Sequence, residues 1–561
     1  MGRKIVIVGG VATGPKAAAR AKRRDPDAEI TIVERGDVYS YAGCGMPFYI
    51  EGLVGDVDEL LCTVGGIRRD EEYFRSVKDV EILGRTEAVK INRGSKTVTV
   101  GVLDGGGTRD IPYDKLVLAT GASALVPRIA GIDLESVYRL YSPKDAEAIR
   151  EKLDSGVSRV AVIGGGLIGM EVCGPIAARG CQVMVFEMMD RLVPALLDTD
   201  MSLLLEKYLI EQGVHVRTGS RVTRLIDDGS GRLSGVVAED GSEFKADVAL
   251  VVIGVRPNVE LAQGAGLAIG ETGAIAVNEF LQTSDPEIYA GGDCVENTCL
   301  ITGRKVYVPL GSTANKHGRV IGDNVTGGKT TFPGVASTAV FKVLDFNVGK
   351  TGLNSAQAVK AGFDIVMSVA PKQDCAHYYP GAKPFIVKLI AEKYTGRILG
   401  AQVVGFGQGI KRIDVVATAL RHGCDCKDLA DIDLGYAPPY STAIDPLAHA
   451  ANIVRNKIEG LAHGISATEL KSKLEGDGDF ILLDVRSREE VEEKPFPDVR
   501  VRVIPSIELR ERLGELPPDE EIVVFCRTSV RAYEAQRLMS HRGFRDVKFL
   551  DGSLDAWPYP L

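Results

Sequence analysis

Two cysteines stand in surroundings that favour reactive sulfur. Cys44 lies between two glycines in the segment SYAGCGMPFYIE (Ser40–Glu51). Cys526 ends a strand-like run and opens the loop CRTSVR, which carries Arg527 and Arg531 and leads into a predicted helix. The thiolate is the nucleophilic form of cysteine, and the N–H groups of a helix N-terminus and nearby arginines stabilise that anion. We therefore predict two separate sites of sulfur chemistry, one near each end of the chain.

The remaining cysteines and the histidines predict neither a disulfide framework nor a metal site. Ten cysteines in 561 residues are too sparse for a disulfide scaffold, and the seven histidines are scattered. The nearest approach to metal-ligand spacing is Cys424-Asp425-Cys426, which we interpret as structural. We expect no bound metal.

Composition and the first residues restrict the compartment and the partners. The chain begins MGRK and enters the strand-like run Ile5–Val8 without the apolar core of a signal peptide. No uninterrupted apolar stretch is long enough to span a bilayer, so we expect no membrane insertion. A net charge of −9 with no basic block argues against nucleic acid as a partner. We expect a cytoplasmic protein whose functional cysteines work in a reducing compartment.

Two copies of one local pattern must position this chemistry. The segments KIVIVGGVATGPKAAARAKRR (Lys4–Arg24) and RVAVIGGGLIGMEVCGPIAARG (Arg159–Gly180) each predict a strand, a glycine turn and a helix. Each is followed by a second buried strand that ends in an acid, Glu34 in one copy and Glu187 in the other. Two βαβ units of this kind predict either two bound dinucleotides or one duplicated scaffold.

The second copy carries a complete dinucleotide fingerprint. Gly164, Gly166 and Gly169 have the spacing GxGxxG, and Glu187 follows 23 residues after Gly164. The glycines allow a tight turn, a close approach of the backbone to the pyrophosphate and close helix–strand packing. The carboxylate of Glu187 accepts hydrogen bonds from ribose hydroxyls and repels a 2′-phosphate, which favours NADH without excluding NADPH.

The first copy predicts an FAD site when it is combined with two later turns. Val11 replaces the middle glycine of the Gly9–Gly14 fingerprint, but Glu34 again ends the next strand. The turn ATG at 119–121 and the turn GGD at Gly291–Asp293 complete the pattern, because such an aspartate binds the ribityl chain of FAD in flavoproteins with two dinucleotide sites. The residues that we expect to contact FAD are Gly9, Gly14, Glu34, Arg35, Ala88, Thr120, Gly121, Asp293, Pro309 and Ala314.

With these segments in this order, residues 1–455 resemble the pyridine nucleotide-disulfide oxidoreductases. The resemblance implies an α/β fold with two Rossmann-like dinucleotide-binding domains, for FAD and for NAD, and an α+β dimerisation domain. The implied FAD-binding domain has two parts, 1–120 and 249–325, with the NAD-binding domain at 121–248 and the dimerisation domain at 326–455. The resemblance also implies a homodimer.

The lone Cys44 resembles the single-cysteine branch of that family, which contains coenzyme A disulfide reductase, NADH oxidase and NADH peroxidase. Most disulfide reductases of the family carry two redox cysteines spaced C-x4-C, whereas only Cys44 occupies that place here. A thiolate beside the flavin ring exchanges electrons with it, and a flavin pocket with helix dipoles lowers the thiol pKa. Without a neighbouring cysteine, Cys44 must react with an external thiol carrier or with an oxygen atom.

Two tyrosine-rich segments, HYYPGAKP (His377–Pro384) and GYAPPYSTAIDP (Gly435–Pro446), resemble the paired motifs of coenzyme A disulfide reductases. The resemblance implies that Tyr378 and Tyr436, with Tyr440 nearby, come from the partner subunit and reach the active-site sulfur. A phenol there can protonate a departing thiolate. From the residues alone, the same segments could be turns that pack a dimer interface.

The resemblance further implies that coenzyme A binds as a thiol or as a substrate. Lys16, Arg20 and Arg23 share one face of the first helix, where cations suit its phosphates; a solvated basic face is the alternative. The other expected substrate contacts are Ser40, Gly43, Tyr440 and Arg531. Two departures, Ile444 where some relatives have lysine and Gly43 where asparagine is frequent, bear on coenzyme A binding and not on the redox chemistry.

Residues 464–561 resemble an α/β rhodanese domain, in which Cys526 would carry a persulfide. Four segments match in order: LLDVRSREEVEE, IPSIELRERL, VVFCRTSVRAYEAQRLM and FLDGSLDAW. Ser529 stands where the family loop usually has glycine, and VRVIPS replaces a glycine-rich turn, so an inactive structural module is the alternative. Asp484 and Arg486 are expected to support the fold.

The fusion of a single-cysteine flavoprotein with a rhodanese domain predicts sulfur transfer. We predict an NADH-dependent flavoprotein reductase of coenzyme A persulfide, polysulfide or coenzyme A disulfide, with Cys44 as redox nucleophile and Cys526 as sulfur carrier. A water-forming NADH oxidase, which would cycle Cys44 through a sulfenate, leaves the rhodanese domain without a role. A redox sensor or sulfur carrier that binds FAD and coenzyme A without turnover is a third class.

Overall fold

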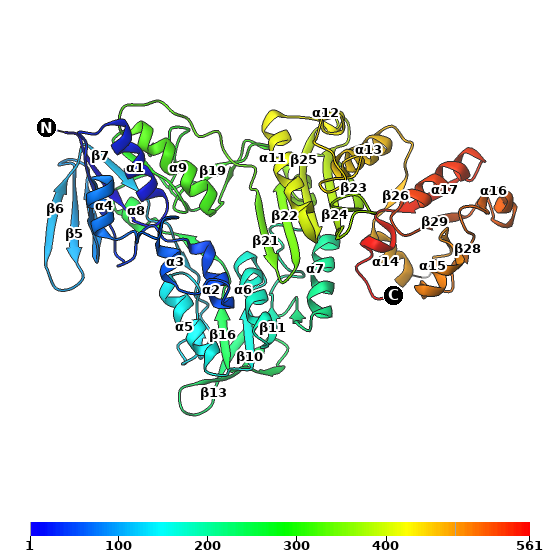
Figure 1. The fold of residues 1–561 in the computed structure, drawn as a ribbon, viewed down its shortest axis with the longest axis horizontal. Helices are drawn as coiled ribbons and strands as arrows, with labels where there is room; N and C mark the ends of the chain where they lie inside the picture. Colours follow the sequence, from blue (N-terminus) through cyan, green and yellow to red (C-terminus); the bar gives the residue numbers. More distant parts are fainter. Residues whose placement is uncertain (1, 477) are drawn as a thin grey trace. The chain divides into compact units, whose positions relative to one another are not determined.

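The computed structural model describes residues 2–476 and 478–561, and the chain divides into two compact units. The first unit comprises Met1–Phe186 and Ser220–Val335, and the second comprises Glu187–Gly219 and Ala336–Leu561. Both contain helices and sheets (Figure 1), and the α/β fold class predicted from the sequence is confirmed. Within the described residues, no helix is long and apolar enough to cross a membrane.

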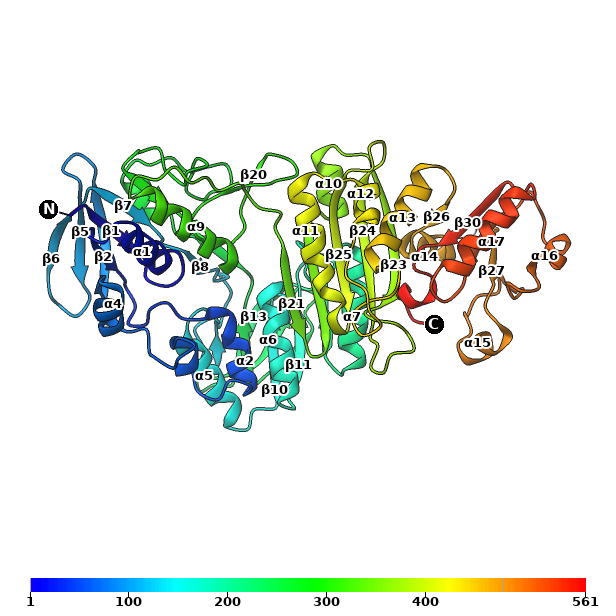
Figure 2. The same ribbon diagram turned by 45° about the horizontal axis from the view of Figure 1, so that its top comes forward.

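The first glycine-rich segment lies at the centre of a parallel sheet in the first unit. The five strands in spatial order are β18 (Ile288–Ala290), β7 (Lys115–Leu118), β1 (Lys4–Val8), β2 (Glu29–Val33) and β3 (Glu81–Leu83). Continuous apolar runs such as that of β1 suit parallel strands covered on both faces. Helices α1 (Thr13–Arg24) and α9 (Gly311–Asn324) pack against each other beside this sheet (Figure 2).

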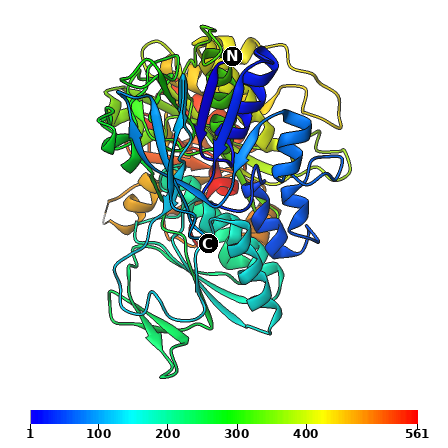
Figure 3. The ribbon, with the colours of Figure 1, turned by 90° about the vertical axis from the view of Figure 1, so that its left-hand side faces the viewer.

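The second glycine-rich segment builds a second parallel sheet in the same unit, and the helices next to it in the chain are cyan in Figure 3. Its strands there are β11 (Gln182–Phe186), β10 (Arg159–Ile163), β16 (Val248–Val251) and β9 (Val137–Tyr138). Helix α6 (Leu167–Ala178) follows β10, and α5 (Pro143–Asp154) precedes it. The short helix α2 (Met46–Glu51) packs against both α5 and α6, which brings the Cys44 segment to the second fingerprint helix.

Short antiparallel sheets and helices complete the first unit. The sheets are β4 (Thr86–Asn92), β5 (Thr97–Val102) and β6 (Thr108–Pro112), then β13 (Val222–Asp227), β14 (Leu233–Ala238) and β15 (Glu243–Lys245). Two-stranded pairs join β8 (Ala122–Ala124) to β17 (Val255–Pro257) and β19 (Asn297–Thr298) to β20 (Lys305–Val306). The helices are α3 (Asp58–Leu61), α4 (Glu71–Lys78) and α8 (Glu260–Gly264).

An antiparallel sheet is the centre of the second unit. Its strands in spatial order are β21 (Ala339–Val343), β22 (Phe346–Gly352), β25 (Ile398–Gly405), β24 (Pro384–Glu392) and β23 (Ile365–Gln373). The helices around it are α7 (Thr199–Glu211), α10 (Ser355–Ala361), α11 (Arg412–His422), α12 (Cys426–Asp431) and α13 (Pro446–Ile458). The contacts of Glu187–Gly219, including α7, assign this segment to the second unit, and the predicted limits of the individual domains remain predictions.

The C-terminal part of the second unit is a parallel sheet with helices (Figure 1, orange and red). The strand order is β26 (Gly464–Ile465), β30 (Asp546–Leu550), β29 (Glu521–Phe525), β27 (Ile481–Asp484) and β28 (Val501–Val503). Its helices are α14 (Ala467–Glu475), α15 (Arg488–Glu493), α16 (Leu509–Arg512) and α17 (Val530–His541). Lys457 of α13 connects it to the antiparallel sheet, because its Nζ donates to Asp551 at 2.6 Å and to the carbonyl of Met367 at 2.7 Å.

Candidate active sites

Cys44 lies in a single 3-10 turn, Gly43–Gly45, directly before α2. Three hydrogen bonds position the segment: the Ser40 N–H donates to Gly10 at 2.9 Å, the Ala42 N–H donates to Leu60 at 2.9 Å, and Arg69 donates to the Ser40 carbonyl at 2.8 Å. The first of these bonds holds the approach to Cys44 against the first glycine turn. Any group bound along that turn therefore lies beside the segment that carries the sulfur.

Without a bound ligand, the surroundings of Cys44 disfavour the ionised thiolate form of its side chain. Cys44 is an exposed residue, but enough protein surrounds its sulfur that desolvation raises the thiol pKa, and the carboxylates of Glu171 and Asp293 raise it further. The helix dipole that the sequence suggested is small, because α2 spans only six residues. A lowered pKa would therefore have to come from a bound group and not from the fold.

Glu171 is a residue of this site that the sequence did not single out. It lies on α6, two residues after Gly169, and burial raises the pKa of its carboxyl to about 7. Its protonation near neutral pH sets how strongly it opposes the Cys44 thiolate. The tertiary contact of α2 with α6 brings the two groups together, and no local spacing could have indicated it.

We expect Glu171→Gln to increase the rate at which iodoacetamide alkylates Cys44 at pH 8 by about threefold, because a neighbouring negative charge is removed and the thiol pKa falls. The difference should vanish below pH 6, where the Glu171 carboxyl is protonated. Peptide mapping after timed alkylation of the FAD-loaded protein measures it. Glu151→Gln, an exposed carboxyl on the neighbouring α5, is the matched control. An unchanged rate in Glu171→Gln would contradict the coupling.

The first glycine turn has the shape that a dinucleotide requires. Gly9 has φ of +113°, and a side chain at Gly14 would collide with the Gly9 carbonyl, so α1 begins tightly against the end of β1. The carboxylate of Glu34 folds over this turn and accepts the N–H groups of Gly10 at 2.6 Å and of Gly36 at 2.7 Å. A carboxylate at this place suits a ribose, and the N-terminus of α1 suits a phosphate.

The later turns predicted for FAD meet the first one. The Thr13 hydroxyl donates to the Ala314 carbonyl at 2.9 Å, and Gly292 packs against both residues. Asp293 follows, with its carboxyl pKa raised to about 6 by burial. At the other turn, the Thr120 hydroxyl donates to the Asn258 carbonyl at 2.7 Å. The residues present thus fit FAD, whose ribityl hydroxyls would satisfy the Asp293 carboxylate.

The structure places the remaining residues predicted to contact FAD, whose roles stay predictions. Gly121 has φ of +66°, and Pro309 lies just before α9. The side chain of Arg35 is exposed and lies 3.7 Å from Glu87, and Ala88 belongs to β4. His317 was missed: it is fully buried, its Nδ1 accepts the Gly292 N–H at 3.1 Å, and burial lowers its pKa to about 4. A neutral His317 therefore orders the turn that carries Asp293.

The second glycine turn repeats the same construction. Gly164 has φ of +115°, and Gly169 packs against its carbonyl, while a side chain at Gly166 would meet open space at the start of α6. That open approach to a helix N-terminus is what a pyrophosphate needs. Glu187 follows β11 in the chain and accepts the Met189 N–H at 2.7 Å. The glycine turn fits the pyrophosphate of a pyridine dinucleotide, and the role of Glu187 at the ribose remains a prediction.

The two tyrosine-rich segments lie side by side in the second unit. The Ala376 N–H donates to the Pro438 carbonyl at 3.1 Å, and Arg412 holds the second segment through Tyr440 and Asp445. A hydrogen bond between the phenols of Tyr378 and Tyr436 is the main cause that raises the pKa of Tyr378. Both rings are exposed, at 65% and 51%, and so is Tyr440 at 72%. The structure thus pairs the two predicted tyrosines on an open surface.

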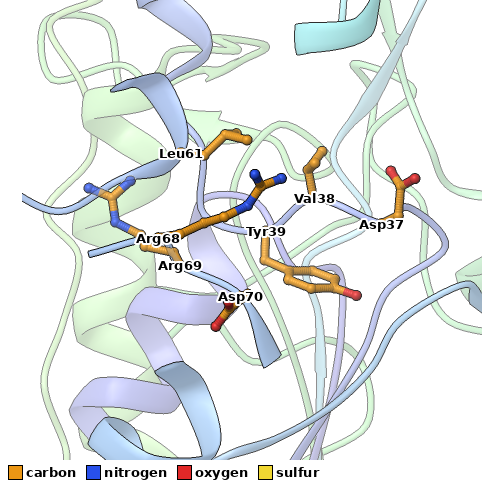
Figure 4. A pocket seen from close by; sticks show the side chains of 7 residues that line it. All are labelled: Asp37, Val38, Tyr39, Leu61, Arg68, Arg69 and Asp70. Carbon is orange, nitrogen blue, oxygen red and sulfur yellow. The ribbon is translucent and has the colours of Figure 1, made fainter. Parts of the chain in front are cut away.

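The basic face of α1 is less uniform than its spacing suggests. Arg20 donates to Asp323 at 2.6 Å and is largely buried, whereas Lys16 and Arg23 are exposed. Near the predicted Ser40 contact, a small polar pocket is lined by Asp37, Val38, Tyr39, Leu61, Arg68, Arg69 and Asp70 (Figure 4). The arginine that donates to Ser40, Arg69, is one of its walls.

Cys526 is buried where β29 ends and the loop to α17 begins. Arg531 is held by Glu490 through two bonds of 2.6 and 2.7 Å, and its pKa is raised mainly by Glu490 and also by Cys526. Arg527 points to Asp555 at 3.4 Å and is mostly exposed. Ser529 adopts φ of +76° and donates to the Leu550 carbonyl at 2.9 Å, so the loop accommodates serine where glycine is usual.

The charged pair behind this loop is buried. Arg486 donates to Asp484 at 2.6 Å, and both side chains are almost fully enclosed. Arg486 also donates to the carbonyl of Glu490, the residue that holds Arg531. Among the described residues, no group of three or more histidine, cysteine or acidic side chains is placed to hold a metal ion.

Three family models match consecutive parts of the chain. Residues 3–318 match the pyridine nucleotide-disulphide oxidoreductase model, residues 338–448 match the dimerisation domain of the same enzymes, and residues 466–558 match the rhodanese-like domain. The chain belongs to the pyridine nucleotide-disulphide oxidoreductase family, whose enzymes use FAD and NAD(P)H. The resemblance found in the sequence is therefore confirmed, including the C-terminal domain.

Two solved structures cover 99% of the chain, and a further relative covers 81% of it. A NAD-dependent persulfide reductase from A. fulgidus is 47% identical, with a TM-score of 0.94 over 99% of this chain and 100% of that one. Reduced CoADR-RHD from Bacillus anthracis is 35% identical, with a TM-score of 0.92 over 99% and 98%. An NAD(P)H coenzyme A polysulfide/persulfide reductase from Pyrococcus horikoshii is 37% identical over 81% of this chain and 99% of that protein.

Proposed function

We propose that this chain is an NADH-dependent flavoprotein reductase of coenzyme A persulfide, polysulfide or coenzyme A disulfide. The observation that carries the proposal is the position of Cys44, a lone cysteine whose segment is hydrogen-bonded to the first glycine turn. The names of the relatives that cover the chain support a sulfur substrate. The attached domain with Cys526 supports the same chemistry, which an oxygen-reducing enzyme would not need.

Cys44 acts as the redox nucleophile in this proposal. Its thiolate attacks the inner sulfur of a coenzyme A persulfide, which forms a Cys44–coenzyme A disulfide and releases hydrosulfide. When bound, FAD supplies the two electrons, taken from NADH, that cleave this disulfide into the Cys44 thiolate and the coenzyme A thiol. Because the resting pKa of Cys44 is raised, keeping the thiolate depends on the flavin ring beside it.

The other predicted residues then bind and orient. Lys16 and Arg23 contact the phosphates of coenzyme A, and Ser40 and Gly43 line its path to the sulfur. We propose a cytoplasmic homodimer in which Tyr378, Tyr436 and Tyr440 of one chain complete the site of the other, since all three are exposed in the single chain. Arg531 stabilises the sulfur anion of Cys526. Glu187 selects NADH through the ribose hydroxyls.

NADH oxidation under four conditions tests the function: anaerobic with coenzyme A persulfide, anaerobic with polysulfide, anaerobic without acceptor, and in air. We expect rapid turnover with coenzyme A persulfide and slow turnover in air. Turnover that requires only oxygen would instead identify an oxidase. Absence of turnover in all four conditions and with coenzyme A disulfide under anaerobic conditions, with FAD bound, would identify a sensor or carrier.

We expect the relay through Cys526 to show in the choice of substrate. Cys526→Ala should lower the rate with polysulfide plus free coenzyme A by about tenfold, because loading of coenzyme A then loses its sulfur carrier. The rate with preformed coenzyme A persulfide should stay within about twofold. The ratio of the two rates measures the effect, and Cys424→Ala, a half-buried cysteine of the same unit, is the control. Equal losses with both substrates would contradict the relay.

We expect Tyr378→Phe and Tyr436→Phe each to lower kcat with coenzyme A persulfide by about tenfold, because a positioned acid is lost. The double variant should lose little more than either single variant, because the two hydrogen-bonded phenols act as one unit. Since the pKa of Tyr378 is raised, the wild-type rate should not fall on this account until the pH exceeds about 10. Tyr394→Phe, with a ring that is 76% exposed, is the control. Single variants with full activity would assign the tyrosines to packing.

A further inference from the structure

Two buried serines beside Cys526 adopt a backbone conformation that favours glycine. Ser529 has φ of +76° and Ser553 has φ of +47°, and the residues are 5% and 0% exposed. A non-glycine residue in the left-handed region destabilises the fold. Both positions nevertheless carry a hydroxyl, and the two hydroxyl oxygens lie 3.4 Å apart. We therefore expect these two serine side chains to have a role in function and not only in the stability of the fold.

The two hydroxyls form a short hydrogen-bond network around the cysteine. The Cys526 N–H donates to the Ser553 Oγ at 3.2 Å, and the Ser553 hydroxyl lies 3.8 Å from the Cys526 Sγ, within range of an O–H···S bond. The carbonyl of Leu550 is an alternative acceptor, 3.3 Å from the Ser553 Oγ and 2.9 Å from the Ser529 Oγ.

The number of protons determines how this network can be filled. Each serine has one proton to donate, and the Leu550 carbonyl needs only one donor. With Ser529 donating to Leu550 at 2.9 Å, the Ser553 proton is free to point at the Cys526 sulfur. Ser529 thus frees Ser553 to act as a donor to sulfur.

We propose that Ser553, supported by Ser529, positions and stabilises the anionic sulfur of Cys526, both as a thiolate and as a persulfide. The inference rests on the proposed role of Cys526 as a sulfur carrier. Loading proceeds when the Cys526 thiolate attacks the outer sulfur of a donor R–S–S⁻, which forms the Cys526–S–S⁻ persulfide and releases R–S⁻. Two monoanions react and two monoanions are formed, so the total charge is −2 on each side and no proton has to move. Ser553 donates a hydrogen bond to the anion, while Arg531 of α17 supplies positive charge.

Glycine variants separate this role from a structural one. Ser553→Gly removes the acceptor of the Cys526 N–H, and Ser529→Gly removes the donor to the Leu550 carbonyl. Both changes also relieve the unfavourable φ, so the two effects offset each other and the stability of the folded state should change little. A purely structural serine would give the same stability with unchanged cysteine chemistry. Ser136→Gly is the matched control, because Ser136 is 6% exposed and has φ of +76° in the other unit.

The test measures alkylation of Cys526 by iodoacetamide from pH 6 to 10 in the full-length, FAD-loaded protein, followed by peptide mass analysis. We expect the rate at pH 7 to fall about tenfold in Ser553→Gly and about threefold in Ser529→Gly, with the pH profile moved upward. The thermal unfolding temperature should change little, and Ser136→Gly should leave the alkylation profile unchanged. An unaltered profile in Ser553→Gly would overturn the inference.

A second measurement keeps the inference distinct from the proposed function. Incubation with inorganic polysulfide, followed by mass analysis, reports the persulfide on Cys526. If the wild-type chain acquires no sulfur there, the carrier role fails, whereas the alkylation profile still decides whether Ser553 stabilises the thiolate. If wild type loads and Ser553→Gly loads at the same rate, the proposed stabilisation is wrong even though the carrier role stands.

Discussion

Anaerobic NADH-dependent reduction of coenzyme A persulfide is expected to fall by at least about 1000-fold when Cys44 is replaced by serine. A serine hydroxyl remains protonated at neutral pH and cannot form the mixed disulfide on which the proposed reaction depends. The variant should fold and bind FAD as wild type does, because Cys44 is an exposed residue at the start of α2. NADH oxidation measured spectrophotometrically, together with the flavin content, gives both results.

The half-buried Cys62 of the same unit provides the matched control, and Cys62→Ser should retain the wild-type rate within about twofold. The outcome against the proposal is specific. If Cys44→Ser with full flavin content still reduces coenzyme A persulfide at a tenth of the wild-type rate or faster, the nucleophile is another group. The alkylation experiment with Glu171→Gln would stay valid in that case, because it measures the reactivity of the Cys44 thiol and not its role in catalysis.

Removing Lys388 is expected to destabilise the second unit by about 3–5 kcal/mol, the cost of leaving buried charges without their partner. Lys388 of β24 donates to Asp200 at 2.8 Å and lies 2.9 Å from Asp198, and all three side chains are buried. Asp198 is bonded in turn to Ser355. In Lys388→Met, two carboxylates remain buried together without a cation. Chemical denaturation monitored by far-ultraviolet circular dichroism measures the loss.

The pH dependence of this cluster has a definite sign. Burial by itself lowers the pKa of Lys388, but Asp200 and Asp198 outweigh it and raise the pKa. Burial raises the pKa of Asp198, but Lys388 outweighs it and lowers the pKa. The raised pKa of Lys388 therefore contributes fully to the stability of the fold below its ordinary value of about 10.5, and this contribution is lost at higher pH. The lowered pKa of Asp198 contributes to the stability of the fold above about pH 4, and this contribution is lost at lower pH. Stability from the cluster is complete between these limits.

Lys342→Met is the control for the loss of a lysine on the same sheet. Lys342 faces Asp345 at 3.2 Å in an exposed pair, so its removal should change the free energy of unfolding by less than about 1 kcal/mol. Equal effects of the two variants would show that the buried cluster contributes no more than a surface pair. Restoration of stability by combining Lys388→Met with Asp200→Asn would support the uncompensated-charge explanation.

The sequence by itself determined the parts of this protein that depend on short stretches of chain. The strand, glycine turn, helix and acid of each dinucleotide unit are adjacent in sequence, and the backbone conformations of Gly9 and Gly164 follow from the lack of a side chain. The apolar runs of β1 and β10 indicated buried parallel strands, because a strand covered on both faces is apolar at successive residues. The family resemblance, carried by segments of this kind, was confirmed for residues 3–318, 338–448 and 466–558.

Tertiary structure alone decided which distant groups meet. Glu171 reaches the surroundings of Cys44 because α2 packs on α6, and Arg20 is occupied by Asp323 because α9 lies against α1. Ser553 reaches Cys526 across 27 positions of chain. Such encounters depend on how helices and loops pack, and a periodicity or a short motif carries no information about them. The sequence therefore singled out Cys44 and Cys526 as candidates, whereas packing determined which charges and hydroxyls surround them.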